Sequence, residues 1–358
     1  MNKNIFIVWI RIGDYHLSRI NAVKRIYGKQ HVFSADIAGS DSLYKWNTGE
    51  VENHFILSDK PAEKGDFFNR FRNFRKVVKE HNIKYCCLAG YGRKEFIAYI
   101  IWSKLTGRKV LLFSESWYGK KSIGTFFKKL LLNLFVDKML VSGINARDFA
   151  INILGQKKEK VAIPYSVVDN NHFKSDEPYN PQHKIMLCMA RFSPEKNQER
   201  LIEAFLQSDL SKTWKLKLVG AGPDKEKLEN LVKDTDKVII SNWADYNTLP
   251  SIYKNSSFFV LASIFEPWGL VVNEAMSAGL PVACASVVGC KPDLVTDKNG
   301  FVFDSFDTDS IKNCFDKISK LSDEQLVMMS DESKKIIENF TPEVWANKLL
   351  ELLEIKHD

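Results

Sequence analysis

The sequence of 358 residues has few of the features that assign a chain to a simple class. It contains no apolar run near the ~20 residues that span a bilayer, no internal repeat and no low-complexity tract. None of its six cysteines is spaced like a metal ligand, and its seven histidines form no cluster. We therefore expect no transmembrane helix and no zinc site, and we expect reduced, packed thiols in a cytosolic protein.

The N-terminal apolar run, which ends at Ile10, could be mistaken for a secretion signal. The run is short, and Arg11 and Asp14 follow it without a cleavage site of small residues. We interpret it as the first buried strand of the fold.

Composition and charge indicate a globular protein with two unlike halves. The chain is 45% hydrophobic and 27% charged, and its length suits two domains. Residues 1–165 contain 29 Lys and Arg against 14 Asp and Glu, a net charge of +15, and the remainder contains 22 against 30, a net charge of −8. This split predicts different partners for the two halves.

Short apolar runs alternate with helical stretches along the chain. This alternation predicts an α/β fold with two parallel sheets covered by helices on both faces. The polar segment 169–183, which carries two prolines, is the expected linker. The expected strands are Ile5–Ile10, His31–Ser34, Tyr85–Ala89, Val110–Ser114, Met139–Val141, Val161–Ile163, Ile185–Ala190, Trp214–Val219, Val238–Ile240, Phe258–Leu261, Val282–Ala285 and Phe301–Phe303.

The segment from Phe265 to Gly279 carries the strongest functional signal. It lies between two expected strands, and a helix begins near Gly269, with Glu266 before the helix and Glu274 about one turn inside it. Free backbone N–H groups at such a helix start attract phosphate, whereas carboxylates suit sugar hydroxyls. The arrangement predicts a site for a nucleotide diphosphate sugar. A single glutamate here would be explained as well by helix capping.

The same segment resembles the motif of two glutamates separated by seven residues in retaining glycosyltransferases of family 4. Three further segments of the second half are similar to that family: Met189–Asn197, with Arg191 and Lys196; Val219–Pro223, with Gly220 and Gly222; and Leu249–Tyr253. The resemblance implies a GT-B architecture, in which two Rossmann-like domains face each other across a cleft. The implied ranges are 1–168 for an acceptor domain, 169–340 for a donor domain and 341–358 for a helix that packs back on the first domain.

The resemblance also implies roles for individual residues. Arg191 and Lys196 would hold the donor diphosphate and stabilise it as it leaves, and Glu266 would join them as a catalytic residue. An arginine fork and a lysine point charge both suit phosphate oxygens. The remaining expected donor-binding residues are Glu274, Gly13, Gly269, Leu270, Val271 and Trp243.

The acceptor side is less clearly marked. His16, after Gly13, and Tyr91, between two glycines, follow expected strands and are candidate acceptor-binding residues. Many family members have a histidine where this sequence reads Phe113-Ser-Glu-Ser-Trp117, and Ser114, Glu115 or Ser116 would line the pocket instead. We take Glu115 and Ser116 as the candidates there.

Two Asp-Thr-Asp triplets, 234–236 and 307–309, are similar to a metal motif of a different glycosyltransferase fold. That motif should follow a buried strand, whereas these triplets lie in a polar loop and at a helix start. We interpret both as caps and turns, and we predict no metal and no cofactor.

Residues 121–135 form a predicted amphipathic helix. Its main apolar stripe comprises Ile123, Phe126, Phe127, Leu130, Leu131 and Leu134 and is expected to face the core. Leu132 and Phe135 would then point to the opposite side, near lysines, which suits a membrane surface. We expect peripheral docking on the inner face of the cytoplasmic membrane through Lys120, Lys121, Lys128, Lys129, Leu132 and Phe135.

Together these features predict a retaining, metal-independent glycosyltransferase acting on a glycan or lipid-linked acceptor in surface polysaccharide or glycolipid synthesis. No nucleic-acid partner is expected. Two alternatives stay open: an epimerase or hydrolase of the same fold, and a non-catalytic subunit that binds a sugar nucleotide. Analysis of the products from a labelled donor would separate them.

Overall fold

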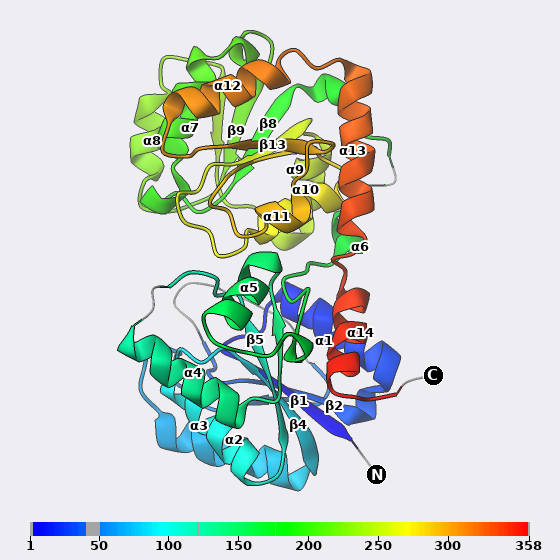
Figure 1. The fold of residues 1–358 in the computed structure, drawn as a ribbon. Coiled ribbons are helices and arrows are strands. Elements are labelled where there is room, and N and C mark those ends of the chain that lie inside the picture. The colour runs from blue at the N-terminus through cyan, green and yellow to red at the C-terminus, as the bar shows by residue number, and fades with distance from the viewer. Residues whose placement is uncertain (1–2, 41–50, 120–121, 176, 357–358) are drawn as a thin grey trace. The chain divides into compact units, whose positions relative to one another are not determined.

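The structure is a computed structural model that describes residues 3–40, 51–119, 122–175 and 177–356. The chain divides into two compact units, shown in Figure 1. Unit 1 comprises residues 1–168 together with 342–358, and unit 2 comprises residues 169–341.

Unit 1 contains a parallel sheet of seven strands in the order β3-β2-β1-β4-β5-β6-β7. Its strands are β1 Asn4–Trp9, β2 Val32–Asp36, β3 His54–Ile56, β4 Ile83–Ala89, β5 Lys109–Ser114, β6 Lys138–Val141 and β7 Val161–Ala162. Its α-helices are α1 Asp14–Tyr27, α2 Phe67–Glu80, α3 Lys94–Leu105, α4 Ile123–Phe135, α5 Ile144–Asn152 and α14 Pro342–Leu352.

Unit 2 contains a parallel sheet of six strands in the order β10-β9-β8-β11-β12-β13. Its strands are β8 Ile185–Met189, β9 Lys215–Val219, β10 Val238–Ser241, β11 Phe258–Leu261, β12 Val282–Ala285 and β13 Gly300–Phe303. Its α-helices are α6 Asn170–Phe173, α7 Gln198–Gln207, α8 Lys225–Leu231, α9 Leu249–Lys254, α10 Leu270–Ser277, α11 Lys291–Leu294, α12 Thr308–Ile318 and α13 Asp323–Ile337.

Helices cover both faces of the unit 2 sheet. Helix α7 packs against α8 and α12, whereas α10 packs against α6 and α13, and these two groups lie on opposite sides of the strands in Figure 1. The central strands are buried along their whole length because both faces are covered. This is the doubly wound α/β architecture that the alternation of strands and helices predicts.

Each strand expected from the sequence is present, and the structure adds one. Strand β3 is short and only half-buried, so its sequence lacks the apolar run that marks the others. The expected linker is partly wrong, because residues 170–173 form helix α6 and pack on α10. The triplet at 307–309 is a helix cap, since the Asp307 carboxylate accepts a hydrogen bond from the Asp309 N–H.

The face assignment of α4 is wrong. Leu132, expected on the membrane side, is fully buried, and Phe135 is half-buried against the core of unit 1. The stripe expected in the core is largely exposed, as Ile123, Phe126 and Phe127 show. The helix is apolar on two opposite sides, so its periodicity did not identify the buried one. Lys120 and Lys121 lie outside the described residues.

Two further properties bear on expectations from composition. All six cysteines are buried and unpaired, and burial raises the pKa of Cys188 to about 12. Within the described ranges, no helix has both the length and the apolar character needed to cross a bilayer.

The C-terminal helix α14 completes the core of unit 1. It packs against α1, and Trp345 is fully buried, with its ring 5.6 Å from Phe113 and 6.5 Å from Trp9. Trp9 and Phe113 are themselves stacked at 5.6 Å. The last helix of the chain therefore joins the central strands β1 and β5 through one aromatic cluster.

Replacing Trp345 by alanine should destabilise unit 1 by about 3–5 kcal/mol, because it removes a large buried side chain. Urea unfolding followed by circular dichroism would measure the loss. Lys348→Ala, on the same helix but outside the aromatic cluster, serves as the matched control. Equal stability of the two variants would contradict the assigned packing.

Candidate functional site

The strand order of unit 2 defines where a ligand can bind. The chain proceeds from β8 to β9 and β10 on one side, and then returns to β11 and β12 on the other. The connections after β8 and β11 therefore leave the sheet in opposite directions at the carboxyl ends of adjacent strands. Ligands of open α/β sheets bind at such a switch point.

Asn197 joins the segments that surround this point. It adopts a left-handed backbone conformation with φ of 57°, which asparagine tolerates better than most residues. Its side-chain amide donates to the carbonyl oxygen of Ala262 at 3.2 Å and to that of Ser305 at 2.8 Å. The loops after β8, β11 and β13 are thereby held together.

Glycines bring the loop after β9 close to the loop after β8. A Cβ atom at Gly220 would lie 2.0 Å from the carbonyl oxygen of Ala190, and one at Gly222 would lie 2.2 Å from that of Phe192. The Phe192 N–H also donates to the carbonyl of Ala221 at 2.9 Å. Only residues without a side chain allow this approach, which fixes the course of the backbone through Arg191.

Lys196 and Glu266 form an ion pair across the switch point. The Lys196 Nζ atom lies 2.5 Å from Glu266 Oε2, and the two side chains are mostly but not completely buried. The Ser263 hydroxyl donates to the same carboxylate oxygen at 3.2 Å. The Gly289 N–H donates to the carbonyl of Glu266 and fixes its backbone. The structure therefore brings together two predicted catalytic residues that are 70 positions apart.

Arg191 contributes a second positive charge. Its side chain is exposed, and no described residue forms an ion pair or hydrogen bond with its guanidinium. Its charge and the Ser193 hydroxyl act on nearby Glu195, where the hydrogen bond from Ser193 is the larger cause of a lowered pKa. An arginine in this state can bind an anion without first breaking a protein contact.

In the sequence, helix α10 begins shortly after Glu266. Gly269 has a φ of +100°, and a Cβ atom there would lie 3.1 Å from the Leu261 side chain. The helix begins at Leu270, so the N–H groups of Leu270 and Val271 belong to its first turn, where helix geometry provides no acceptor. These two residues and Gly269 were predicted to bind the donor, and that role stays a prediction.

Glu274 is more enclosed than the sequence suggested. It is 2% exposed and accepts a hydrogen bond of 2.6 Å from the Tyr253 hydroxyl. Tyr253 lies on α9, the short helix that the sequence predicted. A ribose hydroxyl would have to compete with Tyr253 for this carboxylate. The expected donor-binding role of Glu274 stays a prediction.

Trp243 lies at the margin of the same sheet edge. It follows β10, at the end of the strand order, and is 54% exposed. A free indole face at the carboxyl end of a strand can stack on a planar ring.

Three residues of this region were not selected from the sequence. Asn197, Ser263 and Tyr253 fix or contact the predicted side chains. Asn197 and Tyr253 do lie inside the segments that resemble the family motifs. Ser263 had no such signal, because its partner is identified only by the fold.

In unit 1, His16 occupies the first turn of α1, directly after β1. The Gly13 N–H donates to His16 Nδ1 at 3.1 Å, so the ring proton of neutral His16 resides on Nε2. Burial and, to a lesser extent, the charge of Arg19 lower the pKa of His16 to about 3. His16 is therefore a neutral hydrogen-bond donor at physiological pH.

The other acceptor candidates lie at the same edge of that sheet. Tyr91 follows β4 and hydrogen-bonds with Ser114, the last residue of β5, and with Ser116 just after it. Glu115 accepts a hydrogen bond of 2.7 Å from the Ser166 hydroxyl. Strands β1, β4 and β5 are neighbours, so Gly13, His16, Tyr91, Glu115 and Ser116 share one edge. Their acceptor-binding role stays a prediction.

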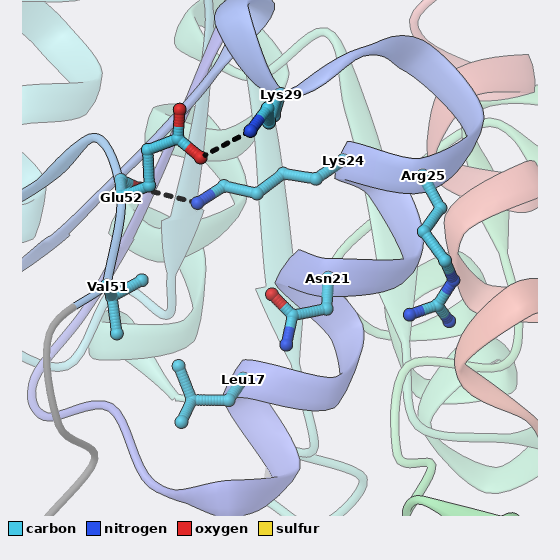
Figure 2. A pocket seen from close by; sticks show the side chains of 7 residues that line it. All are labelled: Leu17, Asn21, Lys24, Arg25, Lys29, Val51 and Glu52. Carbon is cyan, nitrogen blue, oxygen red and sulfur yellow. Dashed lines mark hydrogen bonds and ion pairs between the residues drawn. The ribbon is translucent and has the colours of Figure 1, made fainter.

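A hollow of about 520 Å³ opens along α1, beginning at the residue after His16 (Figure 2). Lys24 and Lys29 reach across it to Glu52, as the figure shows, and Arg25 pairs with Glu343. Because Lys29 is paired with Glu52 and Arg25 with Glu343, Lys24 gives the described lining a net positive charge. Its full lining is Leu17, Asn21, Lys24, Arg25, Lys29, Val51 and Glu52.

Residues 169–354, more than half of the chain, match the model of the family described as glycosyl transferases group 1. The chain belongs to this family.

Curated relatives extend the match. An uncharacterised glycosyltransferase of Haemophilus influenzae is 24% identical over 305 residues, which cover 81% of this chain and 82% of the relative. A second, from Methanocaldococcus jannaschii, is 26% identical over 61% of this chain but only 53% of its own length. An Escherichia coli relative described as a UDP-Gal:alpha-D-GlcNAc-diphosphoundecaprenol alpha-1,3-galactosyltransferase is 27% identical, over 61% of this chain and 55% of its own.

Solved structures establish the architecture of this family member over its whole length. Anabaena HepE in complex with UDP superposes with a TM-score of 0.76 at 16% identity, covering 98% of this chain and 99% of HepE. The sucrose-phosphate synthase of Thermosynechococcus elongatus gives a TM-score of 0.76 at 18% identity and covers 98% of both chains. The two Rossmann-like units are therefore those of the GT-B fold.

The lowered pKa of His16 makes the free energy of unfolding depend on pH. Between its folded value of about 3 and the ordinary value of 6.5, the unfolded chain binds a proton that the folded chain does not. The contribution of His16 to the free energy of unfolding is therefore constant above about pH 6.5 and declines as the pH falls below it.

His16→Gln keeps an acceptor for the Gly13 N–H but does not titrate. The stability difference between wild type and this variant should thus shift against the wild type from pH 8 to pH 5. Urea unfolding at both pH values measures it, and the other histidines cancel in the comparison. An unchanged difference would contradict the assignment.

Proposed function

We propose that this chain transfers a sugar from a nucleotide diphosphate sugar to an acceptor hydroxyl, with retention of the anomeric configuration. The observation that carries the proposal is the Lys196–Glu266 ion pair at the switch point of unit 2, with Arg191 exposed on the same loop. Membership of the group 1 family supports it. So do the UDP-Gal donor in the name of the Escherichia coli relative and the UDP bound by HepE.

The donor diphosphate would bind between the two cations. A diphosphate oxygen would replace Glu266 as the partner of Lys196, and Arg191 would bind a second oxygen through its planar fork. The first-turn N–H groups of α10 would add hydrogen bonds. Glu266, once released from Lys196, would accept hydrogen bonds from hydroxyls of the donor sugar and so position it.

Catalysis would come from positioning and from charge stabilisation rather than from a protein nucleophile. The bond between the anomeric carbon and the diphosphate oxygen breaks, and the acceptor oxygen forms a bond to the same face of that carbon. The acceptor proton passes to an oxygen of the leaving phosphate. Arg191 and Lys196 neutralise the charge that develops there, so we propose transfer without a metal ion.

The rest of the nucleotide would extend over neighbouring residues of unit 2. A ribose hydroxyl would displace Tyr253 from Glu274 and leave that carboxylate hydrogen-bonded. Trp243 offers an exposed ring face for the base.

The acceptor would be a glycan or a lipid-linked sugar, as in surface polysaccharide or glycolipid synthesis. His16 would donate from Nε2 to an acceptor oxygen, and Tyr91, Glu115 and Ser116 would line the same edge. The basic hollow along α1 would suit an acceptor that carries negative charge. An acceptor of this kind implies work at the inner face of the cytoplasmic membrane.

Glu266→Ala should lower transfer at least about tenfold, since a hydrogen bond to a charged group contributes ~1.5–3 kcal/mol and ~1.4 kcal/mol is a decade. Turnover of labelled donor sugars would measure the change. Glu199→Ala, which removes an exposed glutamate of the same unit, is the control. Wild-type turnover by the Glu266 variant would refute its role.

The same assay tests the reaction type. A glycosylated acceptor with the donor's anomeric configuration by NMR supports retaining transfer, and full activity after chelation supports the metal-free mechanism. Free sugar would indicate a hydrolase, an altered sugar nucleotide would indicate an epimerase, and donor binding without turnover would indicate a binding subunit.

Arg191→Ala should weaken binding of a nucleoside diphosphate such as UDP or GDP by about tenfold or more, because it removes a charge-assisted hydrogen bond of ~1.5–3 kcal/mol. Isothermal titration calorimetry would measure the change in Kd. Lys227→Ala, an exposed cation paired with Glu199, is the control. Equal affinity of the two variants would exclude Arg191 from the phosphate site.

A further inference from the structure

Helix α4 presents an apolar face that no described part of the chain covers. Five of its side chains are between 46% and 79% exposed, and two of them are phenylalanines. They recur at helical spacing and so form one continuous stripe. Contiguous exposed apolar surface of this kind marks an interaction site. The stripe consists of Ile123, Phe126, Phe127, Leu130 and Leu134.

The opposite side of α4 is anchored in unit 1. Leu132 is fully buried in the core, and Asn133 donates to the carbonyl of Leu154. The helix is therefore held with its stripe directed outward, and Figure 1 shows α4 at the outside of unit 1. The exposure follows from this anchoring, because at about 100° per residue Leu132 lies opposite the centre of the stripe.

Two lysines flank the stripe, one on each side. Lys128 lies 5.7 Å from the ring centre of Tyr91, and Lys129 runs over the turn at Gly155, where a Cβ atom would lie 2.5 Å from its Cε. At about 100° per residue, Lys129 is roughly a third of a turn and Lys128 about two fifths of a turn from the centre of the stripe. A helix lying in a membrane interface places its lysines in this way, at the level of the headgroups.

The charged side chains on α4 itself all have one sign. Residues 122–136 contain two lysines, Lys128 and Lys129, and no aspartate or glutamate. Beyond Gly155, the exposed Lys157 and Lys158 outnumber the exposed Glu159. This composition is complementary to an anionic surface and repels a cationic one.

We propose that the outward stripe of α4 inserts into the interface of an anionic bilayer, with Lys128 and Lys129 at the phosphate level. The two phenylalanines, Phe126 and Phe127, supply the apolar insertion. This surface is the reverse of the one that the sequence predicted, since Leu132 and Phe135 face the protein. The proposal does not depend on the sugar chemistry, because vesicle binding is measured without any donor or acceptor.

A second copy of the chain is the competing occupant. A two-fold dimer would bring the same patch together with itself, so that lysines would meet lysines with no carboxylate in the segment to pair them. A bilayer that contains anionic lipid satisfies both the apolar and the cationic part of the surface. The charge therefore favours the membrane.

Flotation of the full chain with vesicles of phosphatidylcholine alone, or with about a third phosphatidylglycerol, tests the proposal. The wild type should float with the anionic vesicles. Phe126→Ser/Phe127→Ser should lower the partition coefficient at least about tenfold, because burial of one phenylalanine alone corresponds to about a decade or more. Met328→Ser, an exposed apolar residue of unit 2, is the matched control.

Lys128→Gln/Lys129→Gln should weaken binding to the anionic vesicles only, and Lys233→Gln/Lys335→Gln in unit 2 should leave it unchanged. Circular dichroism and UDP binding verify that each variant is folded. The proposal is overturned if the wild type does not float, or if the α4 variants float like their controls. It is also overturned if sedimentation shows a dimer that the phenylalanine variant abolishes while vesicle binding is absent.

Discussion

The loops around the switch point of unit 2 depend on one asparagine side chain. By donating to carbonyls after β11 and β13, Asn197 fixes three loops that approach the switch point from different parts of the sequence. The adjacent Lys196 can meet Glu266 only because this geometry is set beforehand. A backbone in the left-handed region and two hydrogen bonds thus determine where the charges of the site lie. The glycines at 220 and 222 do the same for Arg191 by allowing backbone contact.

The two sheet edges are prepared for different chemistry. In unit 2, the ion pair of Lys196 and Glu266 compensates both charges, and in the proposed reaction an anion and a hydroxyl would take the places of the two partners. In unit 1, the ring of His16 is neutral and directed by a backbone N–H. A pair of cations suits a diphosphate, whereas a neutral imidazole beside hydroxyl groups and the Glu115 carboxylate suits a sugar.

Much of the fold and part of the site could be predicted from the sequence. Buried parallel strands are short apolar runs, so twelve of them could be found, whereas the half-buried β3 could not. Glu266, Arg191 and Lys196 stand in motifs with fixed spacing. Ser263 and Tyr253 could not be selected from the sequence, because a side chain that hydrogen-bonds to Glu266 or Glu274 produces no repeating sequence pattern. The enclosure of Glu274 was equally invisible, since burial depends on neighbours from other elements.

The sequence by itself determined the alternation of strands and helices, the family motifs and the sign of the charge in each half. These are properties of local composition and spacing. Only the tertiary structure decided which side of α4 is buried. Residues 123–135 are apolar on two opposite sides. The side that carries Leu132 is the buried one, because Leu132 packs into the core of unit 1. Such packing depends on neighbouring elements and not on the periodicity of the helix. The outward stripe, and with it the proposed membrane surface, follows from that packing.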